Sequence, residues 1–115
     1  MSASKKQHAK RGGPIQRYAP PDAKIPARLG GGILKEFVEQ DVASGRLHRY
    51  ALAYINPAIY PGDHGRVLGY DNAHGYPHRH FMGKITPEPH RSWEQIRANF
   101  ENEWRLIAMQ FVNGS

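Results

Sequence analysis

The sequence contains no cysteine, which excludes disulfides, thiolate nucleophiles and every cysteine-based zinc or iron–sulfur site. It also lacks long apolar runs: neither the first thirty residues nor any later stretch reaches signal-peptide or membrane-spanning length. From these two absences we expect a cytoplasmic protein without a membrane partner. The 115 residues are enough for one domain and too few for two.

The excess positive charge is confined to one end of the chain. Residues 1–28 hold seven basic residues and one acidic residue, whereas residues 29–115 hold nine of each, so the first segment carries the net charge of +6. That segment is rich in glycine and proline, and it cannot bury enough apolar surface to offset its ordering entropy. We predict a disordered basic tail over residues 1–30 and a single domain over residues 31–115.

The tail suggests two roles, phosphate contacts to RNA or simple solubilisation of the chain. The candidate nucleic-acid-binding residues are Lys5, Lys6, Lys10 and Arg11. Three glycines at residues 30–32 end the segment. Because no Lys-Ser or Lys-Thr follows them, they predict a flexible hinge rather than a phosphate loop.

Alternating side chains predict an antiparallel sheet in the middle of the chain. In residues 47–55, Tyr50, Leu52 and Tyr54 fall on one face of a strand. A turn at residues 43–45 favours a hairpin with residues 33–42, although a helix also suits that segment. Residues 66–72 and 78–85 predict two further strands, which a glycine-containing turn connects.

The last segment predicts a long helix. Ser92 and Gln95 fit a capping box, in which each side chain bonds the backbone N–H of the other residue. Apolar residues then recur at helical spacing and predict a stripe that packs on the sheet: Trp93, Ile96, Phe100, Trp104, Ile107 and Phe111. The predicted fold class is α+β, a small antiparallel sheet of about four strands packed on one long C-terminal helix.

Titratable side chains crowd into residues 70–80. Strand alternation places His78 and His80 on one face, about 6–7 Å apart along it. One histidine would take a proton from a ribose 2′-OH and the other would donate one, so RNA cleavage would need no metal or cofactor. Asp71 would orient a histidine, and Arg79 or Tyr70 would contact phosphate, although alternation sends Arg79 to the opposite face.

The same residues allow two other interpretations. His78 and His80 with Asp71 or His74 would supply the nitrogen and oxygen ligands that zinc or manganese accepts. Alternatively, Asp71 and Asn72 cap a turn through their side chains, and the histidines are solvated on a strand face.

The order of these motifs resembles the TumE-like family, small proteins described as toxin halves of bacterial toxin–antitoxin pairs. A strand reading HRYALAYI comes first, and a helix with spaced aromatic residues comes last. Between them stand Tyr70-Asp71-Asn72, then Gly75, then His78-Arg79-His80. The chain departs from the pattern in two places: segment 56–65 is longer than expected between the two strands, and His74 and Tyr76 stand in the gap. The basic tail lies outside the resemblance.

The resemblance implies a toxin whose partner is an antitoxin with a DNA-binding helix-turn-helix. Its motif positions are Tyr70, Asp71, Asn72, His78, Arg79 and His80, and Gly75 joins Asn72 as part of the structural motif. RNA cleavage follows by analogy with other small toxins. The leading hypothesis is therefore a metal-independent endoribonuclease toxin. A non-catalytic binding or regulatory module, or a metal-binding protein with the same motif, is the alternative.

Overall fold

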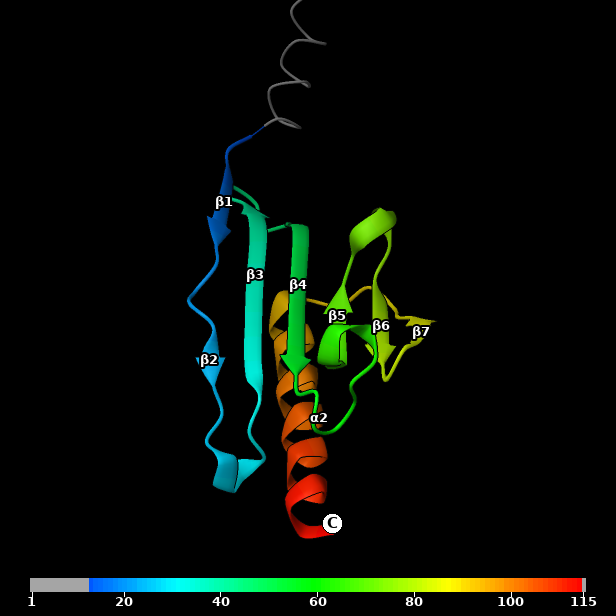
Figure 1. Cartoon of the computed structure of the whole chain (residues 1–115). Coiled ribbons are helices and arrows are strands. Elements are labelled where there is room, and N and C mark those ends of the chain that lie inside the picture. Colours follow the sequence, from blue (N-terminus) through cyan, green and yellow to red (C-terminus); the bar gives the residue numbers. More distant parts are fainter. Residues whose placement is uncertain (1–12, 115) are drawn as a thin grey trace, which may run out of the picture.

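A computed structural model describes residues 13–114, which form one antiparallel sheet with a long helix across one face (Figure 1). The strands are β1 (Ile15–Tyr18), β2 (Ala23–Lys24), β3 (Ile33–Asp41), β4 (Leu47–Ile55), β5 (Arg66–Asp71), β6 (His78–Phe81) and β7 (Lys84–Pro87). Three short 3-10 segments, η1 (Ala27–Leu29), η2 (Asp63–Gly65) and η3 (Ala73–Gly75), and helix α2 (Trp93–Gly114) complete the fold. The predicted α+β class is confirmed.

The sheet is larger than predicted, with seven strands in place of about four. The strand order is β1-β3-β4-β5-β6-β7, and β2 also pairs with β3. Segment 33–42 is a strand, as the hairpin interpretation required. Of the residues described, none belongs to a helix that is both long and apolar enough to cross a membrane.

Part of the extra sheet comes from residues predicted to be a disordered tail. β1 pairs with β3 from Ile15 opposite Asp41 to Tyr18 opposite Val38. Every side chain of β1 and β2 is exposed, so main-chain hydrogen bonds rather than core burial hold these edge strands. The tail prediction is therefore wrong for residues 15–29. Residues 1–12, with Lys5, Lys6, Lys10 and Arg11, lie outside the described residues.

The remaining extra strand comes from a turn inside residues 78–85, which were predicted to be one strand. Met82 and Gly83 both have left-handed backbone angles, with φ of 47° and 84°. A two-residue turn with two positive φ values matches the twist of a hairpin, so the chain reverses here into β7. Methionine is not one of the residues that signal a turn, so the reversal of the chain at Met82 could not be predicted from the sequence.

The core lies between helix α2 and the sheet. Tyr50, Leu52 and Tyr54 are buried on the face predicted for them. They meet the buried residues of the helix, which are Ile96, Phe100, Trp104 and Ala108. The capping box is confirmed, because the Gln95 N–H donates to Ser92 Oγ at 3.1 Å and the Ser92 N–H donates to Gln95 Oε1 at 3.1 Å.

Two of the three glycines predicted to form a hinge, Gly30 and Gly32, instead lie in close packing contacts. A Cβ on Gly30, where φ is +116°, would lie 2.7 Å from the Cβ of Ala108 on the helix. We expect Gly30→Ala to lower the free energy of unfolding by about 3 kcal/mol, through overpacking and left-handed strain together. Gly31→Ala meets nothing within 4 Å at a φ of +73°, so strain alone should cost about 1 kcal/mol. Urea denaturation measures both changes, and equal losses would contradict the packing role of Gly30.

Candidate functional site

The turn between β5 and β6 brings Asp71, His78 and His80 together. Asp71 pairs with His78 in the register of the two strands, and His80 lies two residues further on the same face. His78 Nε2 lies 2.7 Å from Asp71 Oδ1, and His80 Nε2 lies 3.0 Å from Asp71 Oδ2. The two imidazole rings are 4.9 Å apart, so the predicted shared face is confirmed.

The two histidines of the cluster have different partners. In His78, Nε2 faces the Asp71 carboxylate and Nδ1 faces the carbonyl of Tyr76 at 3.1 Å. Both of these partners only accept hydrogen bonds. In His80, Nδ1 lies 3.1 Å from Nη2 of Arg66, which only donates. His80 is therefore neutral, with its proton on Nε2 and directed at Asp71.

Arg66 and Asp63 complete the cluster, and sequence reasoning missed both. The loop from Asn56 closes through the Asn56 N–H and the carbonyl of Gly65 at 2.8 Å, which brings η2 to the start of β5. Arg66 Nε then donates to Asp63 Oδ2 at 2.8 Å. Two carboxylates, Asp63 and Asp71, therefore lie beside the guanidinium of Arg66. Their only sequence signal was an Asp and an Arg three residues apart, which is common on surfaces.

Burial and the charge of Arg66 lower the pKa of His80 below its ordinary value of 6.5, although Asp71 acts in the opposite sense. The unfolded chain therefore takes up a proton at this histidine at a higher pH than the folded chain does. The resulting stability is complete above pH 6.5 and is lost as the pH falls from there towards the folded-state pKa.

We expect the free energy of unfolding to fall between pH 7 and pH 5, with a contribution from His80 of at most about 1.4 kcal/mol per pH unit. Urea denaturation across this range measures the slope. In His80→Asn the slope should be shallower by that contribution. An identical slope in the variant would show that His80 does not resist protonation.

Tyr70 and Arg79 lie on the opposite face of the sheet, against helix α2. Arg79 donates twice to Glu103, at 2.7 Å and 3.1 Å, and the Tyr70 hydroxyl donates to the same carboxylate. Burial and the hydrogen bond to Glu103 raise the pKa of Tyr70. The alternation argument for Arg79 is confirmed, and the structure does not bring Tyr70 and Arg79 together with the histidine pair.

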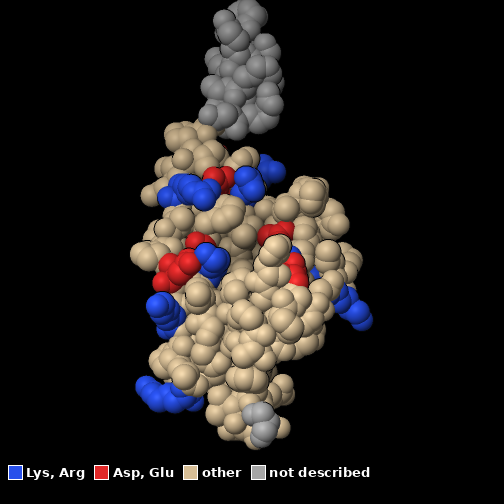
Figure 2. Space-filling model, viewed as in Figure 1, with Lys and Arg blue, Asp and Glu red and all other residues tan. Residues whose placement is uncertain are grey.

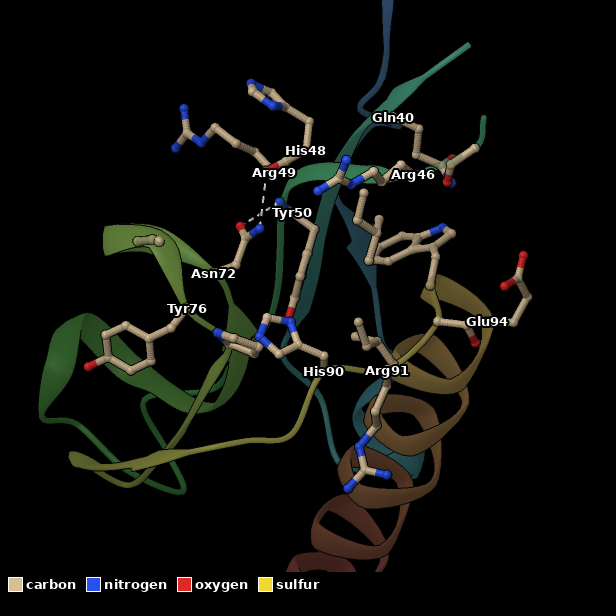
Figure 3. A pocket seen from close by; sticks show the side chains of 18 of the residues that line it. Gln40, Arg46, His48, Arg49, Tyr50, Asn72, Tyr76, His90, Arg91 and Glu94 are labelled. Atoms are coloured by element: carbon tan, nitrogen blue, oxygen red, sulfur yellow. Dashed lines mark hydrogen bonds between the residues drawn. The ribbon is translucent and has the colours of Figure 1, made fainter. Parts of the chain in front are cut away.

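Asn72 and the η3 segment hold the turn beside the cluster. The Asn72 side chain accepts the N–H of Tyr50 at 3.0 Å and donates to the carbonyl of His48 at 3.1 Å, so it fixes the end of β5 to β4 (Figure 3). Gly75 adopts a φ of 89°, which favours glycine. The rings of His74 and Tyr76 lie 6.4 Å and 5.1 Å from that of His78, so they cover it from the outside.

A metal ion would find three ligand atoms here, because those of Asp71, His78 and His80 lie within 4.8 Å of one another. Imidazole and carboxylate suit zinc or manganese. Arg66 opposes such a site, since its donation to Nδ1 of His80 leaves the ring proton on Nε2 and no lone pair for a metal. Its guanidinium also lies 3.9 Å from Asp71 Oδ2. The donor set therefore fits a hydrogen-bonded triad better than a metal site.

Comparison of the chain with protein-family models, with curated proteins and with solved structures finds no match. What the site does is therefore argued from its own geometry.

Proposed function

We propose that this chain is the toxin of a bacterial toxin–antitoxin pair and cleaves RNA without a metal. The observation that carries the proposal is a single carboxylate, Asp71, in contact with both His78 and His80, where the other ring nitrogen of His78 faces a carbonyl and that of His80 faces a guanidinium. These partners suit a charged His78 beside a neutral His80. An acid and a base that act on one phosphodiester need this difference in protonation. The toxin role and its helix-turn-helix antitoxin partner rest on the resemblance to the TumE-like motif.

In this mechanism His80 is the base and His78 is the acid. The substrate phosphate draws Arg66 away from His80, and Nδ1 of His80 takes the proton of the ribose 2′-OH. The 2′-oxygen attacks phosphorus, and Arg66 stabilises the charge that develops on the phosphorane. His78 donates its proton to the 5′-oxygen as the P–O5′ bond breaks. The products are a 2′,3′-cyclic phosphate and a 5′-hydroxyl.

Access to the pair requires movement of its cover. The side chains of His78 and His80 are nearly buried, whereas His74 and Tyr76, which lie against His78, are exposed. Hydrogen bonds of catalytic groups often rearrange when substrate binds. The proposal therefore requires the η3 segment to open outward.

Induction of the protein in a bacterial host tests the toxin role. We expect the wild-type chain to arrest growth and the His78→Ala/His80→Ala double variant, at matched expression, to allow it. Arrest by both would place the toxicity outside the histidine pair. Growth of both would overturn the toxin proposal and favour the non-catalytic binding module.

Metal binding is the second candidate, and the close approach of three ligand atoms favours it. It predicts about one equivalent of zinc or manganese in protein purified without a histidine tag. The metal-independent proposal predicts far less than one equivalent, and elemental analysis by mass spectrometry distinguishes the two.

A further inference from the structure

A groove of about 820 Å³ lies next to the histidine cluster, at the end of the sheet where helix α2 begins (Figure 3). It is bounded by the end of the β3–β4 hairpin, by η3 and by the segment that enters the helix. Six basic side chains line it: Arg46, His48, Arg49, His74, His90 and Arg91. Glu94 is the one acidic residue in its lining.

The basic residues of the groove are accessible to a ligand, because all six are exposed. Within residues 13–114, no ion pair involves Arg46 or Arg49. The Arg49 guanidinium lies 5.7 Å from the centroid of the Phe37 ring, and Arg91 forms an ion pair with Glu88 at 3.7 Å. On the face of the molecule shown in Figure 2, basic and acidic side chains are interspersed. Among the described residues outside the groove, Arg17 pairs with Glu39 and Lys35 with Asp22. The groove therefore gathers three arginines and one glutamate, whereas residues 13–114 as a whole carry a formal net charge of only +2.

Two further features support RNA as the ligand of the groove. His74 and Tyr76 line the groove and also lie against His78, so the groove ends at the cover of the histidine pair. Pro14, among the first residues that the structure describes, lies near the rim of the groove. The carbonyl of Pro14 accepts the N–H of Val42 at 2.9 Å, beside the hairpin residues that line the groove.

We infer that the groove binds the phosphate backbone of single-stranded RNA and leads it to the His78–Asp71–His80 cluster. Arginine binds phosphate through a fork of N–H donors, and exposed rings stack on bases without sequence preference. The choice of RNA rests on the proposed function, whereas the binding itself does not require cleavage.

The test uses the full-length protein and a fluorescein-labelled 2′-O-methyl RNA of twelve nucleotides, which lacks the attacking hydroxyl. We expect Arg46→Ala/Arg49→Ala to weaken binding roughly tenfold or more at 0.1 M salt. The slope of log affinity against log salt should become shallower by about 1.4, because each lost phosphate contact on a single strand removes about 0.7. Fluorescence anisotropy over a salt series measures both values.

Arg28→Ala is the matched control. Arg28 is exposed in η1 and lies far from the groove. It is close in sequence to Gly30, which contacts Ala108 on the helix. Ala108 lies about 22 Å along the helix from Trp93, which lines the groove. The affinity and salt slope of Arg28→Ala should equal those of the wild type. Equal affinity and slope in the double variant would overturn the inference. Displacement of the RNA by a poly-glutamate peptide of similar affinity would instead assign the groove to an acidic protein partner.

The proposal that the chain cleaves RNA and the inference that the groove binds RNA can be contradicted independently. If RNA binds through Arg46 and Arg49 but is never cleaved, the nuclease proposal is wrong and the inference that the groove binds RNA stands. If Arg46→Ala/Arg49→Ala cleaves RNA at the wild-type rate, the inference that the groove binds the substrate is wrong and the nuclease proposal stands.

Discussion

Asp71→Ala is expected to lower the free energy of unfolding by about 3 kcal/mol, because it leaves two nearly buried histidines without the carboxylate that contacts both. The substitution also removes the acceptor of the Ala73 N–H, 3.1 Å away, which holds the start of η3. For a domain of this size the loss corresponds to a fall in Tm of roughly 10–20 °C. Thermal unfolding followed by circular dichroism measures it.

Asp71→Asn separates the structural role of this residue from its charge. The amide oxygen can accept from His80, and the amide nitrogen can donate to Nε2 of a neutral His78. That nitrogen replaces Oδ1, so the hydrogen bond from the Ala73 N–H is lost. We expect a loss of only about 1 kcal/mol. Cleavage should nevertheless be lost, since His78 then has no second proton to donate. A loss as large as that of alanine would show that the negative charge itself stabilises the fold.

His78→Asn is expected to slow RNA cleavage by about 10²- to 10⁴-fold, the usual contribution of a general acid or base. His80→Asn should do the same, because either variant leaves one proton transfer unassisted. The measurement is the single-turnover cleavage rate of a short RNA in the presence of a chelator, with thermal unfolding run beside it to confirm that each variant is folded.

The control for both variants is His64→Asn. His64 is exposed in η2 and has a φ of 55°, a backbone conformation that asparagine tolerates well. It should cleave at the wild-type rate. If His78→Asn and His80→Asn matched it, the pair would be structural and not catalytic.

The sequence predicted the parts of the fold that carry strong patterns. The apolar stripe of α2 and the capping box at Ser92 are local signals, and both appear in the structure. The face shared by Tyr50, Leu52 and Tyr54 followed from strand alternation alone. These predictions succeeded because each depends on periodicity or on residues three apart.

The edge strands could not be predicted in the same way. β1 and β2 bury no side chain, so no pattern of apolar residues distinguishes them from a polar tail. The cation of Arg17 over Phe37, 4.4 Å from the ring centroid, joins residues far apart in sequence. The reversal at Met82 depends on two positive φ values that methionine rarely adopts.

For the candidate site, alternation predicted which side chains would meet. It placed His78 with His80 and separated Arg79 from them. What it could not supply was the contribution of the loop, because Arg66 and Asp63 reach the histidines only after residues 56–65 fold back beside β5. The burial of the pair was also unexpected, since exposed strand histidines are the commoner arrangement.

The proposed mechanism depends on attack by a ribose 2′-OH that the histidine pair assists. The direct measurement uses an oligonucleotide of deoxynucleotides with one ribose, incubated with excess protein and chelator and examined by mass spectrometry. The mechanism predicts that only the phosphodiester on the 3′ side of that ribose is cleaved, which leaves a 2′,3′-cyclic phosphate and a 5′-hydroxyl. With His78→Asn the oligonucleotide should stay intact. An intact oligonucleotide with the wild-type protein, or products with a 3′-hydroxyl and a 5′-phosphate that form only when metal is added, would contradict the mechanism.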